Sequence, residues 1–109
     1  MEYIKYYYNM SHMLKGCYSL KSLESLNNWD TKKVINMSYL FSDCYSITSL
    51  EGITNWEVDN AFNIKLMLQE CLLITNLNRL SKWNVSNDTN MSHISYCHSI
   101  VSSLGSHSN

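Results

Sequence analysis

The stretch Asn36–Trp56, NMSYLFSDCYSITSLEGITNW, is one copy of a unit that recurs along this 109-residue chain. Three residue types keep the period. The tryptophans lie at positions 29, 56 and 83, the cysteines at 17, 44, 71 and 97, and the recurring asparagines at 9, 36, 63 and 90. The spacing is 27 residues except between the last two cysteines, where it is 26. Such a period is typical of repeat proteins, in which each unit packs on its neighbours.

The period predicts a single repeat domain over residues 1–109. Residues 1–8 correspond to the tail of a preceding unit, residues 9–35, 36–62 and 63–89 are three repeats, and residues 90–109 are a partial repeat. Neither end carries a recognisable polar capping repeat. Uncapped repeats expose apolar surface and a strand edge, so we expect end-to-end self-association.

The first half of each unit has the apolar spacing of an amphipathic helix. In the second unit Met37, Leu40, Phe41 and Cys44 fall at i, i+3, i+4 and i+7. This spacing predicts a helix of about two turns with one buried face. Asn36 stands directly before it, where an N-cap residue would accept a backbone N–H.

The second half places an apolar residue at every third position: Ile47, Leu50, Ile53 and Trp56. This period fits neither a long helix nor a long strand. It predicts a coil with an inward side chain at each bend and a short strand around Thr48–Glu51. Stacked copies would place these strands side by side in a parallel sheet. The tryptophans continue the same phase, so we expect them in the core.

Composition excludes several functional classes. The net charge is −1 and the basic residues are scattered, so we expect no nucleic-acid partner. The apolar runs are too short to span a bilayer, which argues against membrane insertion. The opening residues, MEYIKYYY, lack the apolar region of a signal peptide. A hydrophobic content of 45% favours a folded chain over a disordered one.

The repeat resembles a known family. NMSYLFSDCYSITSLEGITNWEV, and NMSHMLKGCYSLKSLESLNNWDTKKV before it, are similar to BspA-like leucine-rich-repeat surface proteins, especially the mycoplasma-type lipoprotein repeat. The similarity spans about Asn9 to Leu104. The matching residues are Asn36, Met37, Ser38, Phe41, Cys44, Ile47, Leu50, Asn55 and Trp56, with Asp30, Thr31 and Val34 in the earlier unit.

The resemblance implies an α/β fold: a short leucine-rich-repeat solenoid with a parallel β-sheet on one face and short helices on the other. It also implies a secreted or cell-surface location and a role in adhesion and protein binding, with no catalytic residue. Without a signal peptide in this chain, a cytoplasmic location is the alternative.

Several residues carry a second interpretation. The four cysteines are predicted to be buried free thiols, with a disulfide between stacked neighbours or a metal site as alternatives, although no CxxC spacing occurs. His93, Cys97 and His98, with His107, are a further metal alternative. The N-x-S motifs are read as the start of each repeat rather than as glycosylation sites; they begin at Asn9, Asn36, Asn84, Asn87 and Asn90. A cation between Glu24 and Glu51 is less favoured than a solvated surface. We expect no metal and no cofactor.

We therefore expect a protein-binding module rather than an enzyme. If Leu23, Leu50 and Leu77 point inward, their neighbours along a strand point outward. These neighbours form the predicted partner-binding face: Ser22, Glu24, Ser49, Glu51, Asn76 and Asn78. The partner would be a protein of a host or a second copy, with a basic patch opposite the two glutamates. The alternatives are a cytoplasmic scaffold on the same fold and a degenerate gene fragment without independent function.

Overall fold

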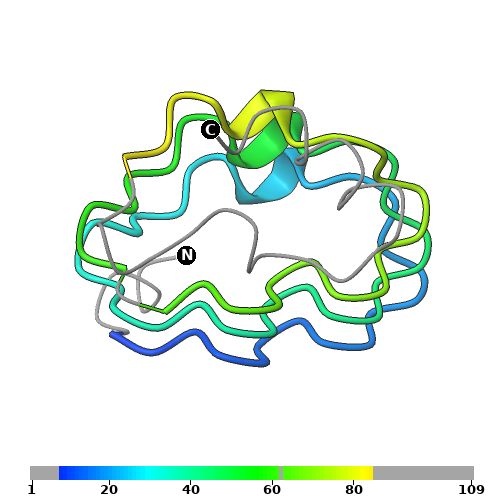
Figure 1. The fold of residues 1–109 in the computed structure, drawn as a ribbon, viewed down its shortest axis with the longest axis horizontal. Helices are drawn as coiled ribbons and strands as arrows, with labels where there is room; N and C mark the ends of the chain where they lie inside the picture. Colours follow the sequence, from blue (N-terminus) through cyan, green and yellow to red (C-terminus); the bar gives the residue numbers. More distant parts are fainter. Residues whose placement is uncertain (1–7, 62, 85–109) are drawn as a thin grey trace, which may run out of the picture.

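The computed structural model describes residues 8–61 and 63–84. Three coils of chain, one for each repeat, run side by side (Figure 1). Coil one is residues 9–35, coil two is residues 36–61 and coil three is residues 63–84. Each described coil contains one 3₁₀-helix: η2 Glu24–Leu26, η3 Glu51–Ile53 and η4 Asn78–Leu80. In Figure 1 these three helices lie above one another at one edge of the molecule.

The predicted leucine-rich-repeat solenoid, with its parallel sheet and its helices, is wrong. Across residues 8–61 and 63–84 there is no β-strand and no α-helix. Strand-like pairing is limited to two isolated parallel bridges, Asn9 with Asn36 and Asn36 with Asn63. In the predicted strand around Thr48–Glu51, the Thr48 N–H reaches the Lys21 carbonyl at 3.4 Å. The chain then turns into η3, so no ladder develops.

The predicted helix over residues 37–44 is replaced by a run of turns, because two of its residues adopt left-handed backbone angles. Tyr39 has φ 59° and Asp43 has φ 63°. A right-handed helix cannot continue through such residues. The same positions are left-handed in coil one, at His12 and Gly16, and in coil three, at Leu66 and Glu70.

We call residues 10–17, 37–44 and 64–71 the turn segments. In the first two, the backbone N–H groups alternate between a neighbouring coil and a carbonyl three residues back. The donors to the next coil are Met10, His12, Leu14 and Gly16, bonded to the carbonyls of Asn36, Ser38, Leu40 and Ser42, and Met37, Tyr39, Phe41 and Asp43, bonded to those of Asn63, Lys65, Met67 and Gln69, at 2.7–3.1 Å. Buried backbone donors need partners. Here half of the donors find them in the next coil instead of in a helix.

The asparagine at the start of each unit makes the predicted type of hydrogen bond but starts a turn instead of a helix. The Asn36 Oδ1 accepts the Ser38 N–H at 2.9 Å and the Ser38 hydroxyl at 2.8 Å. Asn9 and Asn63 accept the N–H two residues ahead in the same way. This is the Asx-turn geometry that asparagine favours.

The predicted inward positions do form the core. All eight of those in coil two are buried: Met37, Leu40, Phe41, Cys44, Ile47, Leu50, Ile53 and Trp56. The equivalent residues of coil three are buried as well. Several in coil one, among them Leu14 and Trp29, are only partly buried. The described chain covers coil one from one side only, which accounts for the difference.

The tryptophans join the coils as well as filling the core. The Trp56 Nε1–H donates to the Leu26 carbonyl at 2.9 Å, and the Trp83 Nε1–H donates to the Ile53 carbonyl at 3.0 Å. The Trp29 and Trp56 rings are stacked with centroids 6.1 Å apart. Each of these two bonds reaches back to the preceding coil, so the predicted core role is confirmed.

Candidate binding surface

The six residues of the predicted partner-binding face are all exposed, and they lie where the chain enters the 3₁₀-helices. They form two rows across the three coils. The turn row is Ser22, Ser49 and Asn76, and the outer row is Glu24, Glu51 and Asn78, the first residue of each helix. We keep the name binding face for these six residues, although no sheet lies beneath them.

The turn row holds the backbone of the outer row in place. The Ser22 Oγ accepts the Glu24 N–H at 3.1 Å, and the Ser49 Oγ accepts the Glu51 N–H at the same distance. In coil three, the Asn76 Oδ1 accepts the Asn78 N–H at 3.0 Å. Serine and asparagine side chains stabilise turns through such local bonds. The turn row therefore shapes the surface, and the outer row presents its side chains on it.

Beside the outer row, the three coils differ at one register position. It holds Ser25 in coil one, Gly52 in coil two and Arg79 in coil three. The backbone of η3 lies so close to coil one that a Cβ on Gly52 would be 2.0 Å from the Leu23 carbonyl oxygen. Only glycine permits this approach. A residue as large as Arg79 cannot reproduce it between coils three and two.

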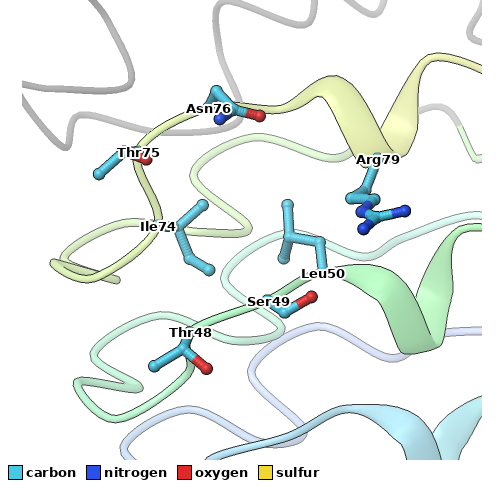
Figure 2. A pocket seen from close by; sticks show the side chains of 7 residues that line it. All are labelled: Thr48, Ser49, Leu50, Ile74, Thr75, Asn76 and Arg79. Carbon is cyan, nitrogen blue, oxygen red and sulfur yellow. The ribbon is translucent and has the colours of Figure 1, made fainter.

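A cavity of about 150 Å³ opens between coils two and three. Figure 2 shows its lining, with the Arg79 side chain extending from η4 toward coil two. Leu50 and Ile74 are its apolar residues, both nearly inaccessible to solvent. The polar lining residues are Thr48, Ser49, Thr75, Asn76 and Arg79. Ser49 and Asn76 belong to the turn row, so the cavity adjoins the binding face.

The Arg79 guanidinium makes no hydrogen bond and no ion pair with the part of the chain that the structure describes. Arginine is charged at all physiological pH values and presents five N–H donors. The side chain is exposed. It is therefore a cation available to a ligand at the edge of a partly apolar cavity.

A second cavity, of about 230 Å³, lies between coils one and two beside the stacked indoles of Trp29 and Trp56. Thr31 lies beside it and donates from Oγ1 to the Glu57 carbonyl at 2.9 Å. Its charged lining residues are Asp30, Lys32 and Glu57. Because charges of both signs line it, the cavity selects for no one ligand charge.

The cysteines serve as inter-coil donors. Cys17, Cys44 and Cys71 are free thiols, and the last two are buried. The Cys44 thiol donates to the Leu14 carbonyl at 3.1 Å, and burial raises the pKa of this thiol. The Cys71 thiol donates to the Phe41 carbonyl at 3.1 Å. In this part of the chain the disulfide alternative is wrong.

Within residues 8–61 and 63–84, no cluster of three or more histidine, cysteine or acidic residues could hold a metal ion. The alternative site at His93, Cys97, His98 and His107 lies outside the described residues, as does the partial repeat over residues 90–109. No helix in the described part of the chain is both long and apolar enough to cross a membrane.

Sequence reasoning missed Arg79 and the cavity, although one signal was present. Aligning the three units at their tryptophans places Ser25, Gly52 and Arg79 in one register. The sequence also gave no weight to the exposed apolar residues that follow the cysteines. Tyr18 and Tyr45 are stacked at 5.2 Å, and Leu72 and Leu73 are exposed at the equivalent place in coil three.

The fold and the surface define a repeat protein whose coils are joined in register by backbone hydrogen bonds. Comparison by sequence agrees: residues 4–106 match the family described as "Mycoplasma protein of unknown function, DUF285", and the chain belongs to this family. The predicted mycoplasma-type repeat is confirmed at this coarser level. No curated protein and no solved structure matched the chain.

Proposed function

We propose that this chain is a non-enzymatic protein-binding repeat module and that its partner docks on the binding face. The observation that carries the proposal is the local hydrogen bonding of that face. In all three coils a turn-row side chain holds the N–H of the outer-row residue, as with Ser49 and Glu51. The same exposed geometry is thus presented three times.

A surface ordered before binding favours association, because less conformational freedom is lost when the partner arrives. The side chains of the face are small or polar and lie outside the core. They can differ between copies of the repeat without disturbing the packing beneath them. These are the properties of a recognition surface on a repeat scaffold.

The outer row favours a partner with a basic patch. Glu24 and Glu51 occupy the same register in neighbouring coils, and both are exposed. Neither forms an ion pair within the described residues. Complementary charge accelerates association and selects among partners.

The proposed setting is the cell surface, where the chain would take part in adhesion. This rests on the resemblance of NMSYLFSDCYSITSLEGITNW to the BspA-like surface proteins and on the mycoplasma family match. A cytoplasmic scaffold would use the same binding face with a different class of partner. A degenerate fragment would bind no partner through it.

Charge reversal on the face tests the proposal. Glu51→Lys is expected to weaken binding of an isolated partner by about tenfold, since a favourable charge becomes repulsive. Its thermal midpoint stays near that of wild type. Asp59→Lys is the matched control, because Asp59 is exposed on the same coil and the change in net charge is identical. Affinity is measured by biolayer interferometry.

The proposal is wrong if Glu51→Lys leaves the affinity of the partner unchanged while a change on the turn segments abolishes binding. Tyr39→Ala is the variant for that second arm. Tyr39 lies in the turn segment of the same coil and is stacked on His12 at 4.7 Å.

A further inference from the structure

The cavity between coils two and three has the composition of a site for a small anion with an apolar stem. Its two apolar residues, Leu50 and Ile74, are 2% and 3% exposed. The guanidinium of Arg79 is the one cation among the lining residues. Figure 2 shows the Ser49 hydroxyl turned toward the side on which Arg79 lies.

The polar groups beside Arg79 offer hydrogen-bond donors. The Ser49 Oγ and the Asn76 Oδ1 each accept a backbone N–H. A hydroxyl retains its own proton for donation, and a carboxamide retains two N–H donors. Because the acceptor atoms are engaged with the backbone, both side chains present donors to a ligand.

We infer that this cavity is a carboxylate subsite of the binding face, with Arg79 as its charged contact. The inference rests on the proposed function, because the carboxylate would belong to the partner protein as an Asp, Glu or C-terminal group. A guanidinium matches the two oxygens of a carboxylate with two parallel hydrogen bonds. The aliphatic stem of the partner residue would lie against Leu50 and Ile74.

The cavity favours a carboxylate over a phosphate. A phosphate group carries more charge and more acceptor oxygens than one guanidinium neutralises. The apolar floor suits methylene groups, and a volume of about 150 Å³ accommodates a short side chain.

The subsite also gives the face a direction. Glu24 and Glu51 make the outer row negative in coils one and two, whereas Arg79 makes it positive in coil three. A partner segment would therefore place a basic residue on coils one and two and its carboxylate on coil three. Reversing the segment would oppose like charges, which selects against it.

Titration of the full chain with acetate tests the subsite directly. ¹⁵N-labelled protein is titrated with sodium acetate at constant ionic strength, set with sodium chloride, and acetamide is the neutral control of the same shape. We expect saturable shifts of the Arg79 side-chain Nε–H and of the Ser49 and Asn76 amides with acetate only.

Three variants sharpen the result. Arg79→Ser introduces the residue that coil one carries at this register, and it is expected to weaken acetate binding by about tenfold or more. Arg79→Lys keeps the charge but loses the fork, so its affinity falls between the two. Glu51→Gln removes a competing carboxylate from the neighbouring helix and raises acetate affinity. An unshifted Trp83 Nε1–H resonance shows that coil three remains packed, because this group bonds to Ile53.

The outcomes separate this inference from the proposed function. Acetate binding that depends on Arg79, together with about tenfold weaker partner binding by Arg79→Ser, supports the inference. Equal shifts with acetamide, or equal acetate binding by Arg79→Ser, overturn it and leave the Glu51→Lys test of the face untouched. If acetate binds through Arg79 but only Glu51→Lys weakens the partner, the inference is wrong and the proposed function stands.

Discussion

The turn segments and the 3₁₀-helical stretches join neighbouring coils in different ways. In the turn segments, four backbone N–H groups of coil one and four of coil two donate to carbonyls of the next coil. Beside the helices, the one inter-coil backbone bond we find is from Thr48 to Lys21. There the joint depends on side chains, through the Trp56 indole and the close approach at Gly52.

The difference determines which half of the repeat tolerates sequence drift. Coil three begins NIKLML where coil two begins NMSYLF, yet the carbonyls of Lys65, Met67 and Gln69 still accept from coil two in register. Every residue has a carbonyl, so this joint requires few particular side chains. At the helices, one change of register residue, from Gly52 to Arg79, accompanies a cavity.

The largest expected effect is at Trp56, where the side-chain joint is concentrated. Trp56→Ala removes a side chain that is 5% exposed, stacks on Phe41 and donates to the Leu26 carbonyl. Truncating a buried tryptophan costs about 3–5 kcal/mol, so the variant is expected to unfold or nearly so. Urea denaturation followed by circular dichroism measures the loss.

Tyr18→Ala is the control for that change, because Tyr18 is an aromatic residue with 59% exposure. Its cost is expected to stay within about 0.5 kcal/mol. A loss as small for Trp56→Ala would show that the backbone bonds of the turn segments hold the coils together without the side-chain joint.

The next effect is at Gly52, where one methyl group meets a backbone carbonyl. Gly52→Ala would place its Cβ 2.0 Å from the Leu23 oxygen, so η3 must move away from coil one. Overpacking against an atom that cannot rotate aside is expected to cost about 3 kcal/mol. Thermal unfolding gives the magnitude. Ser25→Ala, at the same register in coil one, is the control and is expected to be near neutral, since that site already holds a Cβ.

Part of this fold could be predicted from the sequence because hydrophobic spacing reports which side chains face inward. The positions Met37, Leu40, Phe41 and Cys44 are buried as predicted. The spacing does not specify the backbone that places them there. A helix and a run of turns with a left-handed residue at every fourth position bury the same set, and only the destination of the N–H groups distinguishes them.

The binding face could be predicted in part for the same reason. Exposure followed from the three-residue phase around Leu50, while the turn chemistry of Ser49 was readable but was assigned to a strand. The cavity could not be predicted from one repeat. It lies where coils two and three meet at Arg79, the position that approaches coil one closely as Gly52, so it depends on comparing coils.

The smallest expected effect is at the left-handed positions of the turn segments, and it tests whether that backbone is intrinsically strained. Gly16 and Glu70 share one register, with φ 75° and 62°. A Cβ on Gly16 would meet nothing closer than 3.7 Å, so Gly16→Ala changes backbone preference with little steric cost. The left-handed conformation costs a residue other than glycine roughly 1–2 kcal/mol, partly offset by a more restricted unfolded chain, so we expect a loss of about 1 kcal/mol.

Glu70→Gly is expected to do the opposite and to stabilise the chain by about 0.5 kcal/mol, because relief of the left-handed strain exceeds the added entropy of the unfolded state. Glu57→Gly is the matched control: Glu57 is an exposed glutamate whose φ is not positive. It is expected to lose about 0.5–1 kcal/mol, since glycine there relieves no strain. The midpoints of urea denaturation rank the three variants. If Glu70→Gly destabilises as much as Glu57→Gly, the turn segment is not strained at Glu70, and its hydrogen bonds to the neighbouring coil are the whole of its stability.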